Sequence, residues 1–213
     1  MPYFPLLFKN DLSCLIVGGG QVATRKIEAL AEMASPITII APQITPFIES
    51  GTRKGSMRWL KREYLEGDCR GFQLVIAATP DKGTNRKVSE EAKQLGIPIN
   101  VVDDPQLSTV IFPAVWRDGS LLVAVSTEGT APFMAAEIRT RLAGGIRRMG
   151  RWVDIAGRFR EIVRREIRNP EEKLRLYRRF IEAGEPEESA NPPDKDDLND
   201  WIAWLDTRRA HRS

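Results

Sequence analysis

Apolar runs and amphipathic stretches alternate along the first half of the chain. Runs rich in Val, Ile and Leu predict buried strands, and stretches with apolar residues at helical spacing predict helices. We predict strands within residues 12–18, 36–42, 57–64, 72–79 and 97–103, and helices within residues 21–33 and 87–96. This alternation indicates a parallel sheet with right-handed crossovers, whose ligand lies beyond the carboxyl ends of the strands.

The pattern changes after residue 103. Residues 108–127 read STVIFPAVWRDGSLLVAVST, which predicts the antiparallel strands VIFPAV and LLVAVS joined by the turn RDGS. A helix should begin near Pro132 and continue to Met149. Because a hairpin that is apolar on both faces is marginal alone, we assign this region to dimerisation. The expected α/β fold has a Rossmann-like parallel sheet (1–113), a hairpin-plus-helix dimerisation region (114–149) and a helical C-terminal region (150–213).

Charge is unevenly distributed over the second half of the chain. Residues 139–180 hold 14 Arg or Lys against 5 Asp or Glu, whereas residues 182–206 hold 9 acids and one lysine. The basic stretch is either a solvated helix face, a surface for an anionic substrate, or a nucleic-acid site, and the scarcity of interleaved aromatic residues argues against nucleic acid. The acidic end carries an apolar stripe that packs on its own domain or docks on a partner: Leu198, Trp201, Ile202 and Leu205.

The stretch CLIVGGGQVATRK, residues 14–26, places a glycine turn between a predicted strand and a predicted helix. It matches G-x-G-x-x-A, in which the first glycine allows the tight turn, the second lets a pyrophosphate approach and the small third residue lets the helix pack closely. Free N–H groups at the helix N-terminus then bind the anion. We therefore predict that a dinucleotide binds at Gly18, Gly20, Gln21, Val22 and Ala23.

Two further loops should line this crevice. The second strand ends in Ala41, Pro42 and Gln43, with neither an acid for the ribose hydroxyls nor an arginine cluster for a 2′-phosphate. Ribose recognition is therefore expected from backbone or neutral groups of these residues. Beyond the fourth strand, polar groups either contact the cofactor or cap the next helix: Thr79, Asp81 and Asn85.

Several classes of site and location are disfavoured. The chain has one histidine, His211 near its polar end, and two scattered cysteines, Cys14 and Cys69, so we expect no metal site and structural roles for both thiols. The opening MPYFPLLFKND lacks a basic n-region and a cleavage site, and no apolar run approaches the roughly 18 residues of a membrane span. We expect a cytoplasmic protein with no membrane partner.

Five ordered motifs resemble the precorrin-2 dehydrogenase family, which is also found as the N-terminal part of siroheme synthase. They are MPYFPLLFKNDLSCLIVGGGQVATRK, LVIAATPDKGTNRKVSEEAK, INVVDDP, IFPAV and LLVAVSTEGTAP, within residues 1–142. The resemblance implies NAD as cofactor, and the apolar hairpin favours a homodimer. It also implies oxidation of precorrin-2, a tetrapyrrole with eight carboxylates, to sirohydrochlorin in siroheme biosynthesis, and some members insert ferrous iron to give siroheme.

Oxidation of a reduced tetrapyrrole removes a proton as well as a hydride, so a base is needed. Asp103 follows the apolar run INVV, and the resemblance implies that this aspartate is the catalytic group. The alternative is that Asp103 or Asp104 only caps the turn into Pro105. We predict Asp103 as the catalytic base and Asp104 as a turn residue.

Two other functions remain to be weighed. A nucleotide-sensing module could bind NAD on the same sheet without turnover, but it would need no base at Asp103. A dehydrogenase for small hydroxy acids would usually have a histidine base or a clamping arginine near the crevice.

In the loop STEGTAP, relatives carry a serine that can be phosphorylated, whereas this chain has Thr127, followed by Glu128 where relatives usually have glycine. Alternatively, these hydroxyls cap the helix that begins near Pro132.

Overall fold

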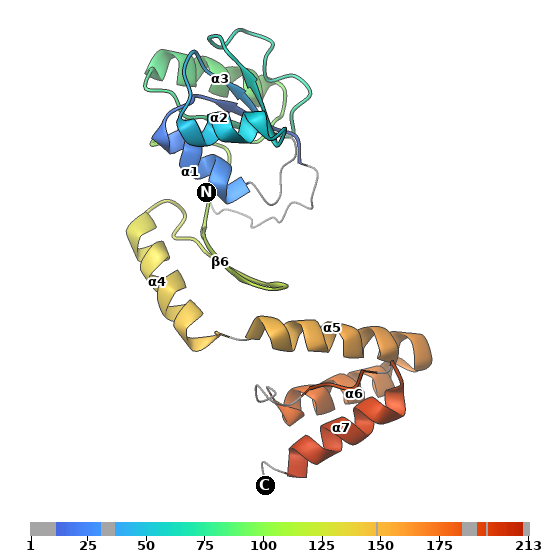
Figure 1. The fold of residues 1–213 in the computed structure, drawn as a ribbon. Coiled ribbons are helices and arrows are strands. Elements are labelled where there is room, and N and C mark those ends of the chain that lie inside the picture. The colour runs from blue at the N-terminus through green and yellow to red at the C-terminus, as the bar shows by residue number, and fades with distance from the viewer. Residues whose placement is uncertain (1–11, 31–36, 148, 185–190, 195, 211–213) are drawn as a thin grey trace. The chain divides into compact units, whose positions relative to one another are not determined.

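The structure is a computed structural model, and it describes residues 12–30, 37–147, 149–184, 191–194 and 196–210. The chain forms two compact units, Met1–Phe112 and Pro113–Ser213. The first is a sheet with helices, and the second is a hairpin followed by helices (Figure 1). Within the described ranges, no helix is both long enough and apolar enough to cross a membrane.

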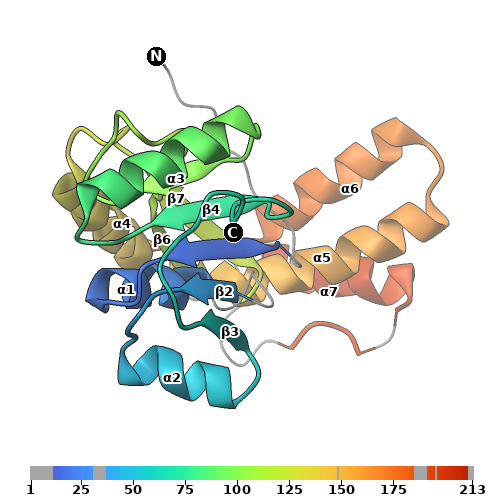
Figure 2. The same cartoon turned by 90° about the horizontal axis from the view of Figure 1, so that it is seen from above.

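The first unit is built on a five-stranded parallel sheet with the order β3-β2-β1-β4-β5. Its strands are β1 (Cys14–Val17), β2 (Ile37–Ile40), β3 (Met57–Leu60), β4 (Leu74–Ala77) and β5 (Ile99–Val101). Figure 2 shows β3, β2, β1 and β4 side by side in this sequence. This strand order is that of a Rossmann fold, so the expected fold class is confirmed.

Two apolar cores cover the two faces of this sheet. Because successive strand residues point to opposite faces, Ile16 packs with α1 (Gln21–Leu30) and α2 (Pro46–Arg53), whereas Val17 packs with α3 (Lys82–Gln94). Both cysteines belong to these cores as free thiols, and burial raises the pKa of Cys14 and of Cys69 to about 12. Thiols held protonated in this way are poor nucleophiles, which fits the expected structural role.

Two helices of the first unit differ from the sequence prediction. Helix α3 begins at Lys82 rather than at residue 87, because the Asp81 carboxylate caps it by accepting from Gly83 N at 3.1 Å and from Thr84 N at 2.8 Å. The short helix α2 was not predicted. It contains Gly51, where an added Cβ would lie 2.6 Å from the sulfur of Met57, so a side chain there would force Met57 of β3 to move.

The second unit comprises the hairpin β6 (Ala114–Asp118) and β7 (Leu121–Val125), then α4 (Pro132–Gly145), α5 (Met149–Glu166), α6 (Pro170–Ala183) and α7 (Leu198–Ala210). The predicted first hairpin strand, residues 110–115, is wrong in its bounds. Thr109 N and Val110 N both donate to Ile99 O, at 2.8 and 3.1 Å, which holds this stretch against β5 instead. Pro113 has no N–H to pair, and the strand begins directly after it.

An aromatic core joins α5, α6 and α7. The Phe159 ring stacks on Phe180 with centroids 5.1 Å apart and contacts Trp201 at 5.6 Å, and Trp201 is 0% exposed. Leu198 and Leu205 of the predicted stripe are buried in the same core. These residues of the stripe therefore pack within their own unit, which is the first of the two alternatives drawn from the sequence.

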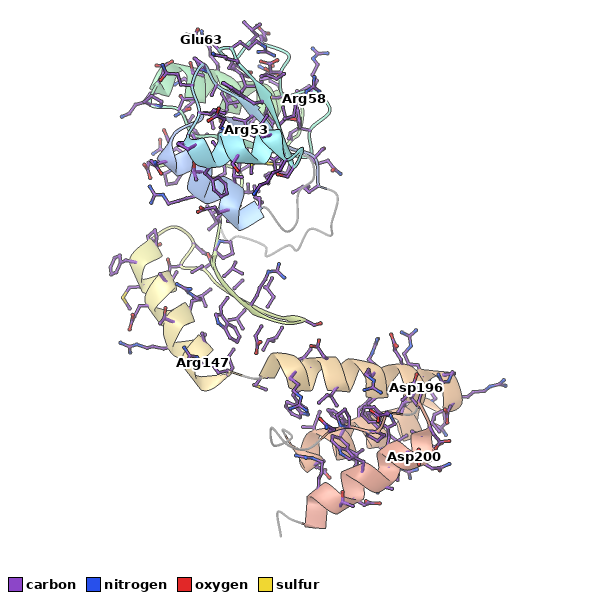
Figure 3. All side chains as sticks on the ribbon, viewed as in Figure 1. Arg53, Arg58, Glu63, Arg147, Asp196 and Asp200 are labelled. Carbon is purple, nitrogen blue, oxygen red and sulfur yellow. The ribbon has the colours of Figure 1, made fainter. Side chains whose placement is uncertain are left out.

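Arginines of α5 hold the acidic connection that leads into α7. They lie seven residues apart on one edge of the helix, at positions 151, 158 and 165. Arg151 donates to Asn191 Oδ1 at 3.1 Å, Arg158 lies 3.8 Å from Asp196 Oδ1, and Arg165 donates to Asp196 O at 2.6 Å. Asp196 is labelled in Figure 3. These three arginines are thus engaged within the chain.

We expect Trp201→Ala to lower the free energy of unfolding of the helical region by about 3–5 kcal/mol, because a large buried side chain is lost from a close-packed core. Urea unfolding followed by far-ultraviolet circular dichroism measures the change. The control is Ile181→Ala on α6, since Ile181 is 64% exposed and should change stability by less than about 0.5 kcal/mol. Equal losses in the two variants would contradict the assignment of Trp201 to the core.

Candidate functional site

The glycine turn lies where the three central strands end together. Val17 of β1 pairs with Ile40 of β2 and with Ala77 of β4. Gly18 has a φ of +125°, and a Cβ there would lie 2.3 Å from the carbonyl oxygen of Ala78. A Cβ on the next residue, Gly19, would lie 2.1 Å from the carbonyl oxygen of Gln43. These two glycines are therefore required by close contact with the protein's own backbone.

The third glycine has a different environment. A Cβ built on Gly20 would have no atom within 4 Å, so the protein itself places nothing against it. Gly20 directly precedes α1, where unpaired N–H groups and the helix dipole favour an anion. Ala23, one turn further, is fully buried and lets the helix pack on the sheet. At Gly20, where the sequence pattern predicts close approach of a pyrophosphate, the turn thus has space for one. The sequence pattern did not predict that Gly19 is required for packing against the loop after β2.

The loop after β2 packs directly against this turn. Gly19 lies so close that an added Cβ would be 2.9 Å from the Cβ of Ala41. Pro42 and Gln43 are exposed, whereas Ala41 is buried and its carbonyl oxygen accepts from Trp59 Nε1 at 2.9 Å. The neutral groups that were expected at the ribose therefore do lie beside the glycine turn, and no acid stands among them.

The loop after β4 is held together by its own polar groups. Asn85 is 7% exposed, and its Oδ1 accepts from Thr79 N at 3.2 Å and from Thr79 Oγ1 at 2.8 Å. Its Nδ2 donates to Thr79 O at 2.9 Å. Hydrogen bonds from the Thr84 hydroxyl and backbone N–H lower the pKa of the Asp81 cap. Asn85 and Asp81 therefore shape this loop, and they leave Thr79 half-buried at the carboxyl end of β4.

The two adjacent aspartates after β5 have different surroundings. Asp104 Oδ1 accepts from Gln106 N and from Leu107 N, both at 3.2 Å, as a turn carboxylate does. Asp103 is exposed, has a φ of +59°, and accepts no hydrogen bond from any residue that the structure describes. A non-glycine residue in this left-handed region is uncommon and is concentrated at functional sites. Only Asp103 therefore offers a carboxylate free for a substrate.

The sequence pattern did not single out three further side chains: Lys26 on α1, Asn100 in β5 and Phe112 after it. Burial lowers the pKa of Lys26 on α1, and the Asp103 carboxylate opposes this effect. The Lys26 ammonium lies 4.3 Å from the centroid of the Phe112 ring. Asn100, which is 8% exposed, donates through Nδ2 to Val110 O at 3.0 Å, but its Oδ1 has no partner within the described ranges. Lys26 and Phe112 come together only because α1 contacts the segment after β5. Their spacing in the sequence could therefore not have predicted this contact.

The remaining predictions concern a metal site, the single histidine and the loop before α4. Within the described part of the chain, no three His, Cys, Asp or Glu side chains come together as a metal site. His211 lies outside the described residues. Thr127 Oγ1 accepts from Ala131 N at 3.1 Å, which stabilises the turn before α4, but the helix itself, with Ala131 as its N-cap, receives no side-chain cap bond. Glu128 has a φ of +52°, a conformation that favours glycine.

Comparison with known proteins agrees with this geometry. The family model described as "Putative NAD(P)-binding" matches residues 7–114. Siroheme synthase of Methylococcus capsulatus is 40% identical over 184 residues, which is 85% of this chain and 39% of that protein. Siroheme synthase of Azotobacter vinelandii is 42% identical over 167 residues, which is 78% of this chain and 36% of that protein. The chain thus spans less than two fifths of the length of these relatives.

The solved structure of "SirC, precorrin-2 dehydrogenase" has a TM-score of 0.73 with this chain at 22% identity. It covers 98% of this chain and 100% of its own, and at this identity it shows a shared fold. The relatives confirm the resemblance drawn from the five motifs. Since the family model matches half of the chain, across the glycine turn and the strands that carry Thr79 and Asp103, the chain belongs to the family of NAD(P)-binding domains.

Proposed function

We propose that the chain is an NAD-dependent dehydrogenase that oxidises precorrin-2 to sirohydrochlorin in siroheme biosynthesis. The observation that carries the proposal is the unpaired Asp103 carboxylate, on the same sheet edge as a glycine turn with open space at Gly20. The names of the relatives, siroheme synthase and precorrin-2 dehydrogenase, support this choice of substrate.

Each part of the crevice has a role in this reaction. When bound, NAD supplies the acceptor for the hydride that leaves a carbon of the tetrapyrrole. The N-terminus of α1 at Gly20 binds the pyrophosphate, and the loop Ala41–Gln43 lies against the ribose. Asp103 takes the proton that must leave with the hydride, and Thr79 lines the rim between these groups. Asp104 stays bound to its turn and keeps the segment after β5 in place.

The main rival is a nucleotide sensor, which would use the same glycine turn without turnover. A sensor needs no unpaired carboxylate beside the nicotinamide, so Asp103 distinguishes the two functions. NAD reduction on addition of precorrin-2, with sirohydrochlorin as the product, is the direct test. Tight NAD binding without oxidation of precorrin-2 would favour the sensor.

The proposal includes the arrangement and location of the protein. We assign residues 1–113 to NAD binding, 114–149 to dimerisation and 150–213 to a helical region. Exposed apolar side chains of α4 support the dimer: Phe133 at 74%, Met134 at 42%, Ile138 at 38% and Leu142 at 46%. A cytoplasmic location is supported by the two free, buried cysteines, since disulfides are rare in reducing compartments.

We expect Gly20→Ala to fold normally but to raise the dissociation constant for NAD about tenfold or more, because the added methyl group occupies the space of the pyrophosphate. Isothermal titration calorimetry with NAD measures the constant. The control is Gly157→Ala on α5, where a Cβ also meets no atom within 4 Å, and it should leave NAD binding unchanged. Unchanged affinity in Gly20→Ala would place the pyrophosphate elsewhere.

We expect Asp103→Asn to keep NAD binding and to lose about 10²–10⁴-fold of the dehydrogenase rate, since an amide cannot accept the proton. The matched control is Asp104→Asn, which should be mild because an amide oxygen can still accept from Gln106 N and Leu107 N. Anaerobic assays with precorrin-2 measure both rates. A parental rate in Asp103→Asn would reject the base, and loss of oxidation with intact insertion of ferrous iron would show that the two activities use different groups.

We expect the chain to sediment as a dimer at micromolar concentration, and Phe133→Ser with Ile138→Ser to make it a monomer, because an exposed apolar surface on α4 is removed from the interface. Analytical ultracentrifugation measures the mass. The control pair, Leu174→Ser with Ile181→Ser, changes exposed apolar residues of α6 and should leave the dimer intact. A monomeric parent chain would reject this interface.

A further inference from the structure

Lys26 is a half-buried lysine whose ammonium has no hydrogen-bond acceptor among the residues that the structure describes. It lies on α1 at the flank of the buried face that Ala23 and Ile27 form, and it is itself half-buried. Its Nζ lies 4.3 Å from the centroid of the Phe112 ring. Among the residues that the structure places, none accepts a hydrogen bond from this ammonium or forms a close ion pair with it.

This arrangement is costly unless something else binds there. An ammonium has three donors, and taking it from water without acceptors opposes its charged form. The Phe112 ring offsets part of this cost through a cation–π contact. The Asp103 carboxylate also acts to keep the amine charged, although it is not in hydrogen-bond contact. Lys26 is therefore a positioned cation with unused donors.

The chemistry of the proposed reaction requires a cation at this place. A substrate with eight carboxylates must bring a reacting carbon close to Asp103, which is itself negative. Two like charges repel more strongly near a protein surface than in bulk water, because the effective dielectric constant is lower there. A cation beside Asp103 offsets this repulsion and can bind one of the carboxylates.

We propose that Lys26 determines specificity by binding a carboxylate of the substrate beside Asp103. This inference rests on the proposed function, which supplies the polycarboxylate. The cofactor is a less suitable partner for Lys26. At 1.5 Å per residue, Lys26 lies about 9 Å along the helix axis from Gly20, where the pyrophosphate binds.

The test is Lys26→Met, which keeps the length and apolar stem of the side chain and removes its charge. We expect the KM for precorrin-2 to rise about tenfold, with kcat within about twofold and NAD affinity unchanged. Lys26→Arg should recover much of the loss. The matched control is Lys54→Met: Lys54 is exposed at the end of α2, toward the amino ends of the strands, and its loss should change neither constant.

Binding of sirohydrochlorin, measured anaerobically by quenching of tryptophan fluorescence, gives a readout that does not depend on turnover. Weaker binding by Lys26→Met than by the parent and Lys54→Met supports the inference, even if the parent fails to oxidise precorrin-2 and the proposed function is thereby rejected. Equal binding by all three proteins overturns it. A fall in kcat with unchanged KM, or a loss of NAD affinity, also overturns it, because Lys26 would then act on Asp103 or on the cofactor.

Discussion

The contact between the glycine turn and the neighbouring backbone is the constraint on which the crevice depends. Strand β1 lies between β2 and β4, so the chain that leaves it must pass between the loops that follow both neighbours. At Gly18 and Gly19 the backbone atoms of those loops stand where a Cβ would be, at 2.3 and 2.1 Å. This close approach sets the start of α1 at the sheet edge, and α1 in turn carries both the proposed anion site and Lys26. A side chain at either glycine would therefore disturb the proposed cofactor site and the proposed substrate contact together.

A second set of hydrogen bonds separates the two aspartates. Ser108 Oγ accepts from Val101 N at 2.9 Å, Thr109 Oγ1 accepts from Ile99 N at 2.9 Å, and Asp104 accepts from the turn that follows it. These bonds fold the segment after β5 back along its own strand. Asp103 is then the residue at the bend, where its left-handed backbone leaves the carboxylate outside the turn. A hydrogen-bonded turn that engages Asp104 and, among the described residues, leaves the Asp103 carboxylate without a partner is what a positioned base requires.

How well each feature could be predicted depends on how far apart in the sequence its interacting residues lie. Strands β1, β2 and β4 are buried on both faces and so read as continuous apolar runs, which is why they were predicted. The predicted start of α3 was five residues late, because the true start is set by a single carboxylate, that of the N-cap Asp81. The first hairpin strand was misplaced because residues 109 and 110 pair with β5 instead. Gly18, Gly20 and Asp103 follow from local motifs. Lys26 and Asn100 do not. The neighbours of Lys26, Asp103 and Phe112, follow it by 77 and 86 residues, and Asn100 bonds to the segment that folds back after β5.

The separation of charge along the second half of the chain also has a structural meaning. Arg151, Arg158 and Arg165 donate to or pair with the acidic connection before α7, and Arg179 pairs with Asp206. Each exposed pair contributes little to stability alone, but together they orient the connection that brings Trp201 into the aromatic core. These arginines therefore serve the helical region first, and a polycarboxylate would have to displace an internal partner to use them. Lys26 has no acceptor within the described ranges and so no such competitor. The physical case for substrate recognition is therefore stronger at this half-buried lysine than along the whole basic helix.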